Sequence, residues 1–396
     1  MKIYIVGTGV DGESTLTKAA EKAIAESGLL IGADRIVKPF MKLGKEVFIT
    51  YRPADIAKKL NSFDHSTAAV LMSGDCGFFS GTKKLLPLLE GHDVQVIAGI
   101  PSASYLCSKI GIPYEKMKFI SLHGRESNIA VNVKMNEHCF FLLGGDMTAA
   151  DVCKRLCEYG LGSADVFIGA ELGYRDECIF TGKASELTDV HTSGLAVLIA
   201  ENKEALHYIP SAINDEKFIR GEIPMTKSEV RCIAVSKLNI KSDSVVWDIG
   251  CGTGSVSLET AYRCPDGKVF AFDKKHEAAA LTIENGRLFS CDNISVTEGE
   301  CPGILADMPV PDKVFIGGSS GNMGGIFEAV HAKNPCADVV VTAVSLETLN
   351  EAIECFEHFG VLPEIVQVSA ARTRKLGTHT MLQAQNPVFI ISGRLI

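Results

Sequence analysis

The sequence lacks a positive charge excess, a long hydrophobic run and a short leader-like segment. Its 39 Lys and Arg are outnumbered by 48 Asp and Glu, for a net charge of −9, which argues against nucleic acid as a partner. No apolar run approaches the roughly 18 residues that span a bilayer. The opening run Lys2–Val6 is too short for a signal peptide. We therefore expect a cytoplasmic protein with no membrane or nucleic-acid partner.

Paired cysteine motifs are also missing. The 13 cysteines are scattered without C-x-x-C pairs and without the histidine spacing of zinc sites. Cys153 and Cys157 are four residues apart on a predicted helix, where they would pack as small apolar groups. This pattern predicts free thiols in a reducing compartment and no metal site.

What is present is an ordinary globular composition in a long chain. The 396 residues are 46% hydrophobic and 22% charged. A chain of this length and composition is expected to form two or three domains, each with its own core.

The second half of the chain is organised around residues 245–260. Val245–Ile249 reads as a strand, glycines follow at 250, 252 and 254, and the apolar spacing then becomes helical. Glycines let the backbone turn sharply and let a ligand approach closely. The helix N-terminus beyond them offers unpaired N–H groups to an anionic group.

The acids near these glycines indicate which ligand could bind. The dinucleotide pattern G-x-G-x-x-G fails here, because Ser255 occupies its third glycine position. Asp248 lies inside the first strand and suits an ammonium group, while Asp273 ends the next strand, Lys268–Phe272, where an acid can reach ribose hydroxyls. S-adenosylmethionine has both an amino-acid end and a nucleoside end. A glycine turn without a ligand and an NAD-dependent oxidoreductase are the alternatives.

The first half repeats an order of apolar strand, Gly/Ser/Asp loop and helix. Met1–Val6 leads into the loop 7–12, and Leu16–Glu26 then reads as a helix with Ser14 or Thr15 as its cap. Further strands are expected at Ala68–Met72, Val94–Ala98, Phe119–Leu122, Cys139–Leu143, Val166–Ile168 and Ala196–Ala200. This is the pattern of an α/β fold with ligand loops at the carboxyl ends of its strands.

Periodicity fades between Glu201 and Glu222, which places a domain boundary there. We predict one domain at 1–210, a linker at 211–222 and a second domain at 223–396. A helix is expected to run to about Leu238, with Thr226 and Glu229 at capping-box spacing. Later strands are predicted at Ile294–Val296, Lys313–Ile316, Val339–Thr342, Pro363–Val368 and Val388–Ile391, following the helix Glu277–Phe289. This alternation predicts a twisted, mostly parallel sheet with helices on both faces.

Short blocks along the chain resemble a known fusion of two domains. In the first half they are G-T-G-V at 7–10, S-G-D-C-G-F at 73–78, G-I-P-S-A-S at 99–104, S-L-H-G-R at 121–125, L-G-G-D at 143–146 and G-Y-R-D-E at 173–177. In the second they are P-M-T-K at 224–227, D-I-G-C-G-T-G-S at 248–255, F-I-G-G-S at 315–319, A-V-S-L-E-T at 343–348 and N-P-V-F-I at 386–390. The chain thus resembles the bifunctional, decarboxylating precorrin-6Y methyltransferases of cobalamin biosynthesis.

The resemblance implies a two-lobed tetrapyrrole (class III) methyltransferase domain followed by a Rossmann-like class I methyltransferase domain. It implies that two S-adenosylmethionine molecules donate methyl groups to carbons 5 and 15 of a precorrin-6-type tetrapyrrole. The second domain would also remove the ring C acetate carboxyl group. A homo-oligomer is expected. A protein that binds S-adenosylmethionine with only one active domain is the alternative.

The resemblance also implies roles for individual residues. In the second domain, the backbone at Gly250, Gly252 and Gly254 would approach the methionine part of the donor. Asp248 would support the loop or bind the ammonium group, Asp273 would bind the ribose, and Glu300 would lie beside the adenine. Gly317 and Gly318 would lie beside the transferring methyl group. In the first domain the other donor would bind at Gly7, Gly9, Val10, Gly74, Asp75, Phe78, Ser102 and Ala103.

A substrate with many carboxylates should meet cations. The densest cationic stretch, with Arg372, Arg374 and His379, is a candidate for this contact, and a solvated turn is the alternative. His123 and Arg125 are the candidates in the first domain. Thr226 and Lys227 would cover the site or only cap a helix.

Overall fold

The computed structural model describes residues 1–63, 66–124, 127–192 and 194–396, which form two compact units. The N-terminal unit contains residues 1–126, 138–152 and 165–201. The C-terminal unit contains residues 127–137, 153–164 and 202–396. The predicted linker at 211–222 divides the chain at one place in the sequence, whereas the compact units combine segments that are separate in the sequence. The linker stays a prediction.

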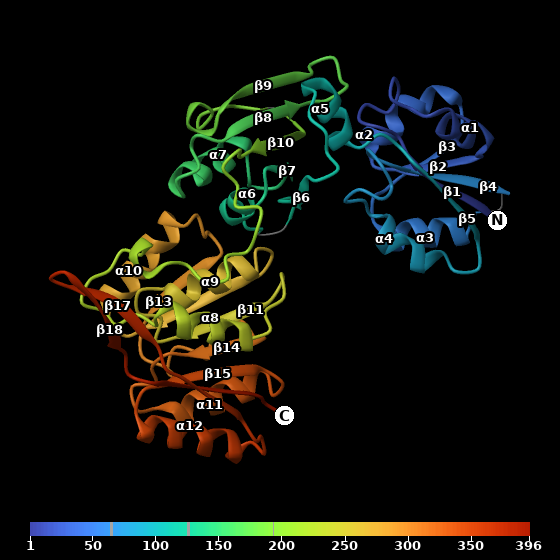
Figure 1. The fold of residues 1–396 in the computed structure, drawn as a ribbon. Helices are drawn as coiled ribbons and strands as arrows, with labels where there is room; N and C mark the ends of the chain where they lie inside the picture. Colours follow the sequence, from blue (N-terminus) through green and yellow to red (C-terminus); the bar gives the residue numbers. More distant parts are fainter. Residues whose placement is uncertain (64–65, 125–126, 193) are drawn as a thin grey trace. The chain divides into compact units, whose positions relative to one another are not determined.

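The N-terminal unit begins with a parallel sheet in the order β3-β2-β4-β1-β5 (Figure 1). Its strands are β1 (Lys2–Gly7), β2 (Leu29–Gly32), β3 (Glu46–Ile49), β4 (Thr67–Met72) and β5 (Asp93–Ile97). Its helices are α1 (Lys18–Glu26), α2 (Asp34–Val37), α3 (Pro53–Asn61) and α4 (Thr82–Leu85), with 3₁₀ turns at Lys38–Leu43 and Leu86–Leu89. Ile3 and Ile5 enter one buried cluster, whereas Tyr4 and Val6 enter another. Both faces of the sheet are therefore covered, as parallel sheets require.

The start of α1 differs from the prediction. Thr17 is its N-cap and accepts a hydrogen bond from the Ala20 N–H. Ser14 and Thr15 lie before the N-cap, in a turn where both hydroxyls donate to the carboxylate of Asp11.

The second sheet of the N-terminal unit is mixed, in the order β6-β7-β10-β8-β9. Its strands are β6 (Lys118–Ser121), β7 (His138–Leu142), β8 (Asp165–Ala170), β9 (Cys178–Lys183) and β10 (Ala196–Glu201), and only β6 and β7 pair in parallel. Nearby in sequence are α5 (Ser102–Ile110), α6 (Ala130–Met135), α7 (Ala149–Glu158) and a 3₁₀ turn at Ala184–Glu186. Two sheets in one unit match the expected two-lobed α/β domain.

The C-terminal unit is built on a seven-stranded sheet in the order β13-β12-β11-β14-β15-β19-β16. The strands are β11 (Val245–Ile249), β12 (Lys268–Asp273), β13 (Ile294–Glu298), β14 (Lys313–Ile316), β15 (Asp338–Ala343), β16 (Glu364–Val368) and β19 (Val388–Arg394). All pairs are parallel except those that β19 makes with β15 and β16. The predicted mostly parallel sheet is confirmed.

Helices cover both faces of this sheet. They are α8 (Ser228–Lys237), α9 (Ser255–Arg263), α10 (His276–Leu288), α11 (Met323–Lys333) and α12 (Leu346–His358), preceded by a 3₁₀ turn at Asp215–Lys217. On β11, Val246 packs into one buried cluster while Trp247 and Ile249 pack into another. The predicted capping box at the start of α8 is wrong. Lys227, not Thr226, is the N-cap, and its ammonium group has no acceptor with which to cap the helix. The Glu229 carboxylate binds Arg372.

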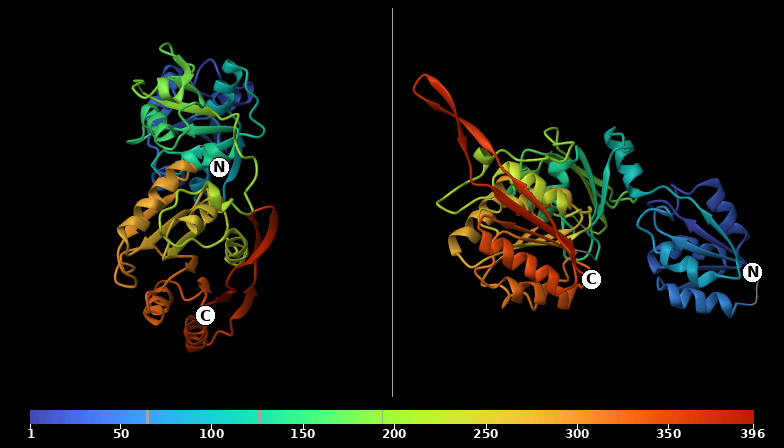
Figure 2. Two further views of the ribbon diagram at one scale, coloured as in Figure 1. Left: turned by 60° about the vertical axis from the view of Figure 1, so that its left-hand side comes forward. Right: turned by 60° about the horizontal axis from the view of Figure 1, so that its bottom comes forward.

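The cationic stretch forms an antiparallel hairpin, with β17 (Ala371–Leu376) and β18 (His379–Ala384) joined at Gly377 and Thr378. Figure 2 shows it projecting from the C-terminal unit. Nearly every residue in it is exposed, so no apolar alternation marks its strands. The stretch is thus an exposed hairpin, and both the substrate contact of its cations and the alternative of a solvated turn stay predictions.

Among the described residues, no helix has both the length and the apolar character to cross a bilayer.

Candidate active site

A cavity of about 730 Å³ opens at the carboxyl ends of the parallel strands of the C-terminal unit. Its size is that of a small-molecule site, and its position is the usual one for ligands in such sheets. Nine of the predicted site residues line it: Thr226, Lys227, Asp248, Gly250, Gly252, Asp273, Glu300, Gly317 and Gly318. Gly254, Arg372, Arg374 and His379 are not among the described residues that line it.

The three glycines after β11 all have left-handed backbone conformations, with φ of 74° at Gly250, 57° at Gly252 and 76° at Gly254. A Cβ at Gly250 would lie 2.8 Å from the Gly318 backbone N and O. At Gly252 it would lie 2.9 Å from the Pro224 carbonyl oxygen, and at Gly254 2.8 Å from the Thr282 side chain. The glycines therefore let three other parts of the unit approach the loop.

Asp248 is completely buried on the cavity wall. Its Oδ2 accepts a hydrogen bond from the Ser257 hydroxyl, while Oδ1 has no partner among the described residues. Burial raises the pKa of Asp248 to about 7, although the Ser257 hydrogen bonds oppose this. A buried carboxylate oxygen without a partner is costly, so this atom could accept a hydrogen bond from a cationic ligand.

Asp273 lies at the tip of β12 beside the glycine loop. Its Oδ2 accepts from the Gly252 N–H at 3.0 Å and its Oδ1 from the Lys275 N–H at 3.0 Å. Each carboxylate oxygen keeps further acceptor capacity. Glu300 is exposed at the next strand end and forms a 3.5 Å ion pair with Lys274. The two acids thus face the cavity from adjacent strands.

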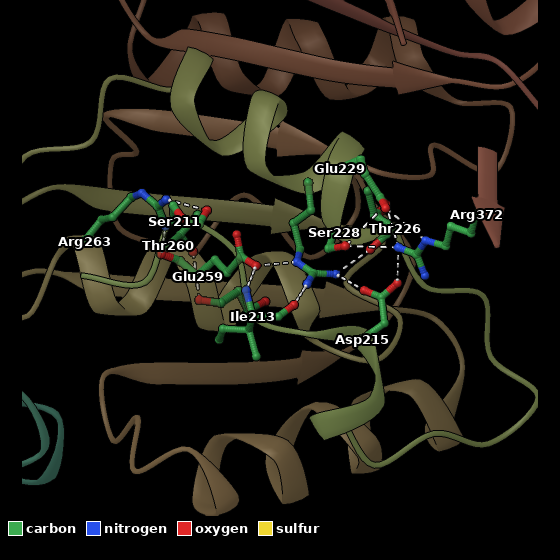
Figure 3. A network of polar contacts seen from close by, with 12 residues as sticks. Ser211, Ile213, Asp215, Thr226, Ser228, Glu229, Glu259, Thr260, Arg263 and Arg372 are labelled. Atoms are coloured by element: carbon green, nitrogen blue, oxygen red, sulfur yellow. Dashed lines mark hydrogen bonds and ion pairs between the residues drawn. The ribbon is translucent and has the colours of Figure 1, made fainter. Parts of the chain in front are cut away.

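A buried arginine that the sequence analysis missed holds one side of this cavity. Arg231 in α8 is fully buried and binds Glu259 Oε1 at 2.6 Å and Asp215 Oδ1 at 3.1 Å. It also donates to the Thr226 carbonyl at 2.6 Å. Figure 3 shows the carboxylates of this network. The one available signal was that Arg231 shares the helix face of the apolar Ala234 and Val235.

Arg372 belongs to the same network rather than to the cavity wall (Figure 3). Its guanidinium binds both Glu229 oxygens, Asp215 Oδ2 at 2.9 Å and the Ser228 hydroxyl at 3.0 Å. These hydrogen bonds, led by those to Glu229, raise the pKa of Arg372 further. Arg374 and His379 are exposed on the hairpin. Arg372 therefore attaches the hairpin to the start of α8.

In the N-terminal unit, the loops that follow β1, β4 and β5 meet. Gly9 and Gly74 exchange backbone hydrogen bonds of 3.1 and 2.8 Å, and a Cβ at Gly7 would lie 2.6 Å from the Gly99 N. Asp75 accepts from the Gly77 N–H at 2.8 Å and the Gly99 N–H at 2.9 Å. The structure thus brings the predicted glycines and Asp75 together, with Asp75 joining two loops.

Apolar members of the predicted first-domain site share one cluster. Val10 and Ala103 are buried in it, and Phe78 packs against it with its ring centroid 5.3 Å from that of Phe119. Ser102 is the first residue of α5. The neighbouring Cys76 thiol is buried and donates to the Ile5 and Ile97 carbonyls.

Of the two residues predicted to contact the substrate's carboxylates in the first domain, the structure describes His123 but not Arg125. His123 lies against the backbone of Gly144, where a Cβ would lie 2.0 Å from the imidazole Nδ1. The blocks at 121–125 and 143–146 therefore meet. Arg125 lies outside the described residues.

Comparisons with known proteins cover both halves of the chain. Residues 2–188 match the family of tetrapyrrole (corrin/porphyrin) methylases, and residues 217–394 match the precorrin methyltransferase domain. A Pyrobaculum calidifontis protein, named as a probable cobalt-precorrin-6B C(15)-methyltransferase (decarboxylating), is 38% identical over 189 residues, which are 47% of this chain and 97% of that protein. The precorrin-6Y C(5,15)-methyltransferase [decarboxylating] of a Sinorhizobium species is 25% identical over 98% of this chain and 94% of its own. A solved Geobacter metallireducens precorrin-6Y C5,15-methyltransferase is 36% identical, with a TM-score of 0.44, over 46% of this chain and 96% of that one.

Proposed function

Because the chain belongs to the precorrin methyltransferases, we propose that it methylates carbons 5 and 15 of a precorrin-6-type macrocycle and removes its ring C acetate carboxyl group. Its tetrapyrrole methylase domain precedes its precorrin methyltransferase domain. S-adenosylmethionine would be the donor for both transfers. The domain at 1–210 would methylate carbon 5, and the domain at 223–396 would methylate carbon 15 and decarboxylate.

The observation that carries this proposal is the unpartnered Oδ1 of buried Asp248 on the cavity wall. The ammonium group of the donor's methionine end would satisfy this atom. The remaining acceptor capacity of Asp273 suits the ribose hydroxyls, and Glu300 lies where the adenine would follow. The N-terminus of α9 offers N–H groups for the methionine carboxylate.

The chain's own residues have mainly a positioning role in this reaction. S-adenosylmethionine supplies an electrophilic methyl group, so the protein must align it with the macrocycle carbon and exclude water. Gly317 and Gly318 line the cavity at the end of β14, and a Cβ at Gly317 would lie 3.2 Å from the Gly250 carbonyl. Glycine has no side chain at these positions, so the backbone would leave space for the transferring methyl group.

A second donor site is proposed at the meeting loops of the N-terminal unit. Gly7, Gly9 and Gly74 bring the β1 and β4 loops together, and Asp75 holds the β5 loop beside them. The backbone groups around Val10, Phe78, Ser102 and Ala103 would then hold the donor. A homo-oligomer and the tetrapyrrole contacts of Arg374 and His379 stay predictions.

The test is a count of donor sites combined with a product mass. Calorimetry should give two S-adenosylmethionine sites per chain, and mass spectrometry should show two methyl groups gained and one carboxyl group lost. One site and one methyl group would instead support a chain with one active domain. Thermal stabilisation by NAD but not by S-adenosylmethionine would contradict the proposal.

A further inference from the structure

Three lysines line the C-terminal cavity: Lys227, Lys274 and Lys275. Lys274 forms an ion pair with Glu300, and the Lys275 side chain is exposed. Lys227 is half-buried. Among the described residues no hydrogen bond or ion pair joins its ammonium group to an acid, although the charge of Asp215 acts on it. A partly buried cation without a partner on a cavity wall is a candidate for binding an anionic ligand.

Asp215, the acid whose charge acts on Lys227, already has two other partners, and the neighbouring Glu229 has an arginine partner. Asp215 is bound by Arg231 at 3.1 Å and by Arg372 at 2.9 Å, and Glu229 is bound by Arg372. Burial lowers the pKa of Lys227, and the charges of Arg220, Arg372 and Arg231 lower it further, against the opposing effect of Asp215. An anion bound at Lys227 would offset the repulsion from these arginines.

The backbone before Lys227 is held in place by buried contacts. Ile223 and Met225 are buried, and the Thr226 carbonyl accepts from Arg231 at 2.6 Å. Lys227 itself is the N-cap of α8, with extended φ and ψ of −69° and 152°. A side chain that starts from a fixed backbone loses less entropy on binding than one on a mobile loop.

We propose that Lys227 binds a carboxylate of the tetrapyrrole that the reaction retains, and so holds the macrocycle in the cavity. This inference rests on the proposed function. The donor's own carboxylate has an alternative partner at the N-terminus of α9, and its cationic groups belong with Asp248 rather than with a lysine.

The carboxylate that Lys227 holds is not the one that leaves. In decarboxylation the bond to the carboxyl carbon breaks, carbon dioxide departs, and the electron pair passes into the conjugated macrocycle, which later takes a proton from water. Negative charge therefore leaves the carboxylate as the transition state forms. An ammonium group on that carboxylate would stabilise the ground state more than the transition state and slow the reaction. A retained carboxylate keeps its charge throughout, so binding it favours both states equally.

The test is steady-state kinetics of the full chain with the precorrin-6-type substrate, for wild type, Lys227→Met and Lys227→Arg. Uniform binding predicts that Lys227→Met raises the KM for the tetrapyrrole about 10- to 100-fold at carbon 15, with little change in kcat. Methylation at carbon 15 and decarboxylation should fall together at low substrate concentration. Lys227→Arg, which keeps the charge, should restore most of the loss.

Lys241→Met serves as the control, because Lys241 is exposed just before β11, at the opposite end of that strand from the cavity. It should leave the kinetics unchanged. Thermal unfolding should show that Lys227→Met is folded, and calorimetry should show that it binds S-adenosylmethionine with wild-type affinity.

Three outcomes would overturn the inference: an unchanged KM in Lys227→Met, a weaker S-adenosylmethionine affinity, or a selective loss of decarboxylation. The second would assign Lys227 to the donor's carboxylate, and the third to the departing group. Failure of the proposed function is distinguishable from all three, since the wild-type chain would then form no methylated product.

Discussion

Arg372 on the β17 strand and Glu229 in the first turn of α8 are joined by hydrogen bonds of 2.9 and 2.5 Å. They lie 143 residues apart in the sequence. The pair attaches an exposed hairpin to the helix whose N-cap, Lys227, lines the cavity. The arginine that the sequence analysis assigned to the substrate is thus occupied by protein carboxylates.

We expect Arg372→Ala to release this hairpin. Amide hydrogen exchange in residues 371–384 should accelerate, while exchange in the parallel strands of the C-terminal unit stays slow. Arg374→Ala, exposed on the same strand, is the control and should leave exchange unchanged. A raised KM for the tetrapyrrole with unaltered exchange would instead favour the direct substrate contact predicted from the sequence.

The ion pair of Arg372 and Glu229 should stay formed at pH values below the ordinary pKa of a glutamate. Bonds from Arg372 lower the pKa of Glu229 to about 2 from an ordinary 4.5. A carboxylate with a lowered pKa stabilises the fold above its unfolded-state value, and this contribution is lost as pH falls from about 4.5 toward 2. The protection of the hairpin amides, taken relative to the intrinsic exchange rate at each pH, should therefore fall in that window in the wild type. Glu229→Gln should show low protection already at pH 7.

Arg231→Met should destabilise the C-terminal unit by about 3–5 kcal/mol, because it leaves the buried carboxylate of Glu259 without its cation. Asp215 would lose one of its two arginine partners and keep Arg372. Chemical denaturation monitored at Trp247, which lies in this unit, measures the effect. Arg287→Met removes an exposed ion pair with Glu158 in the same unit and should cost less than about 1 kcal/mol. Equal losses for the two variants would contradict a structural role for the buried network.

Gly252→Val should abolish carbon 15 methylation. A β-branched residue strongly disfavours the left-handed conformation at φ 57°, and its Cβ would meet the Pro224 carbonyl at 2.9 Å. The substitution therefore displaces the segment that leads to Lys227. Gly324→Val is the matched control, because a Cβ there meets nothing within 4 Å. Product masses should show carbon 5 methylation retained in both variants, and normal carbon 15 methylation by Gly252→Val would refute this role for the glycine.

Binding of S-adenosylmethionine to the C-terminal unit should strengthen as pH rises. Burial raises the pKa of Asp248 to about 7, so below that pH the carboxyl must lose a proton before it can pair with the donor's ammonium group. Affinity should rise up to about tenfold per pH unit and level off above pH 7. Calorimetry between pH 5.5 and 8.5, about this pKa, should show this pH dependence of the affinity. Asp248→Asn should bind S-adenosylmethionine weakly, and its affinity should not change with pH.

The ligand-free protein should show the opposite trend in stability. A carboxyl group with a pKa near 7 when folded and 3.8 when unfolded costs progressively more free energy as pH rises between those values. Asp248→Asn should therefore lose less stability than wild type between pH 4 and 7. A parallel decline in the two proteins would show that Asp248 is not the titrating group.

Asp75→Ala should impair carbon 5 methylation selectively. It frees the N–H groups of Gly77 and Gly99, which Asp75 now binds at 2.8 and 2.9 Å, so the β4 and β5 loops lose their connection. Asp75→Asn keeps one acceptor oxygen and should retain more activity. Product masses separate the two methylations, and equal loss at both carbons would indicate that the transfers are coupled.

Local sequence features predicted most strands of the sheets, although β2, β3 and β9 were not predicted. Val245–Ile249 was predicted with the bounds that β11 has, because a short apolar run bounded by glycines has few other conformations. The hairpin of β17 and β18 was not predicted as strands, since exposure on both faces removes the apolar alternation. The cap of α1 was misplaced because Ser14, Thr15 and Thr17 are all plausible caps, and only the folded chain brings Asp11 to the first two.

By itself the sequence determined the α/β class, the strand ends that carry the glycine loops, and the family to which the chain belongs. These depend on short-range patterns of apolar residues, glycines and acids. Tertiary structure alone decided that Arg372 binds Asp215 and Glu229, that Asp248 keeps one buried oxygen unpartnered, and that Lys227 reaches the cavity without an acid of its own. The physical reason is that a charge acquires its partner and its desolvation only when segments distant in the sequence pack together.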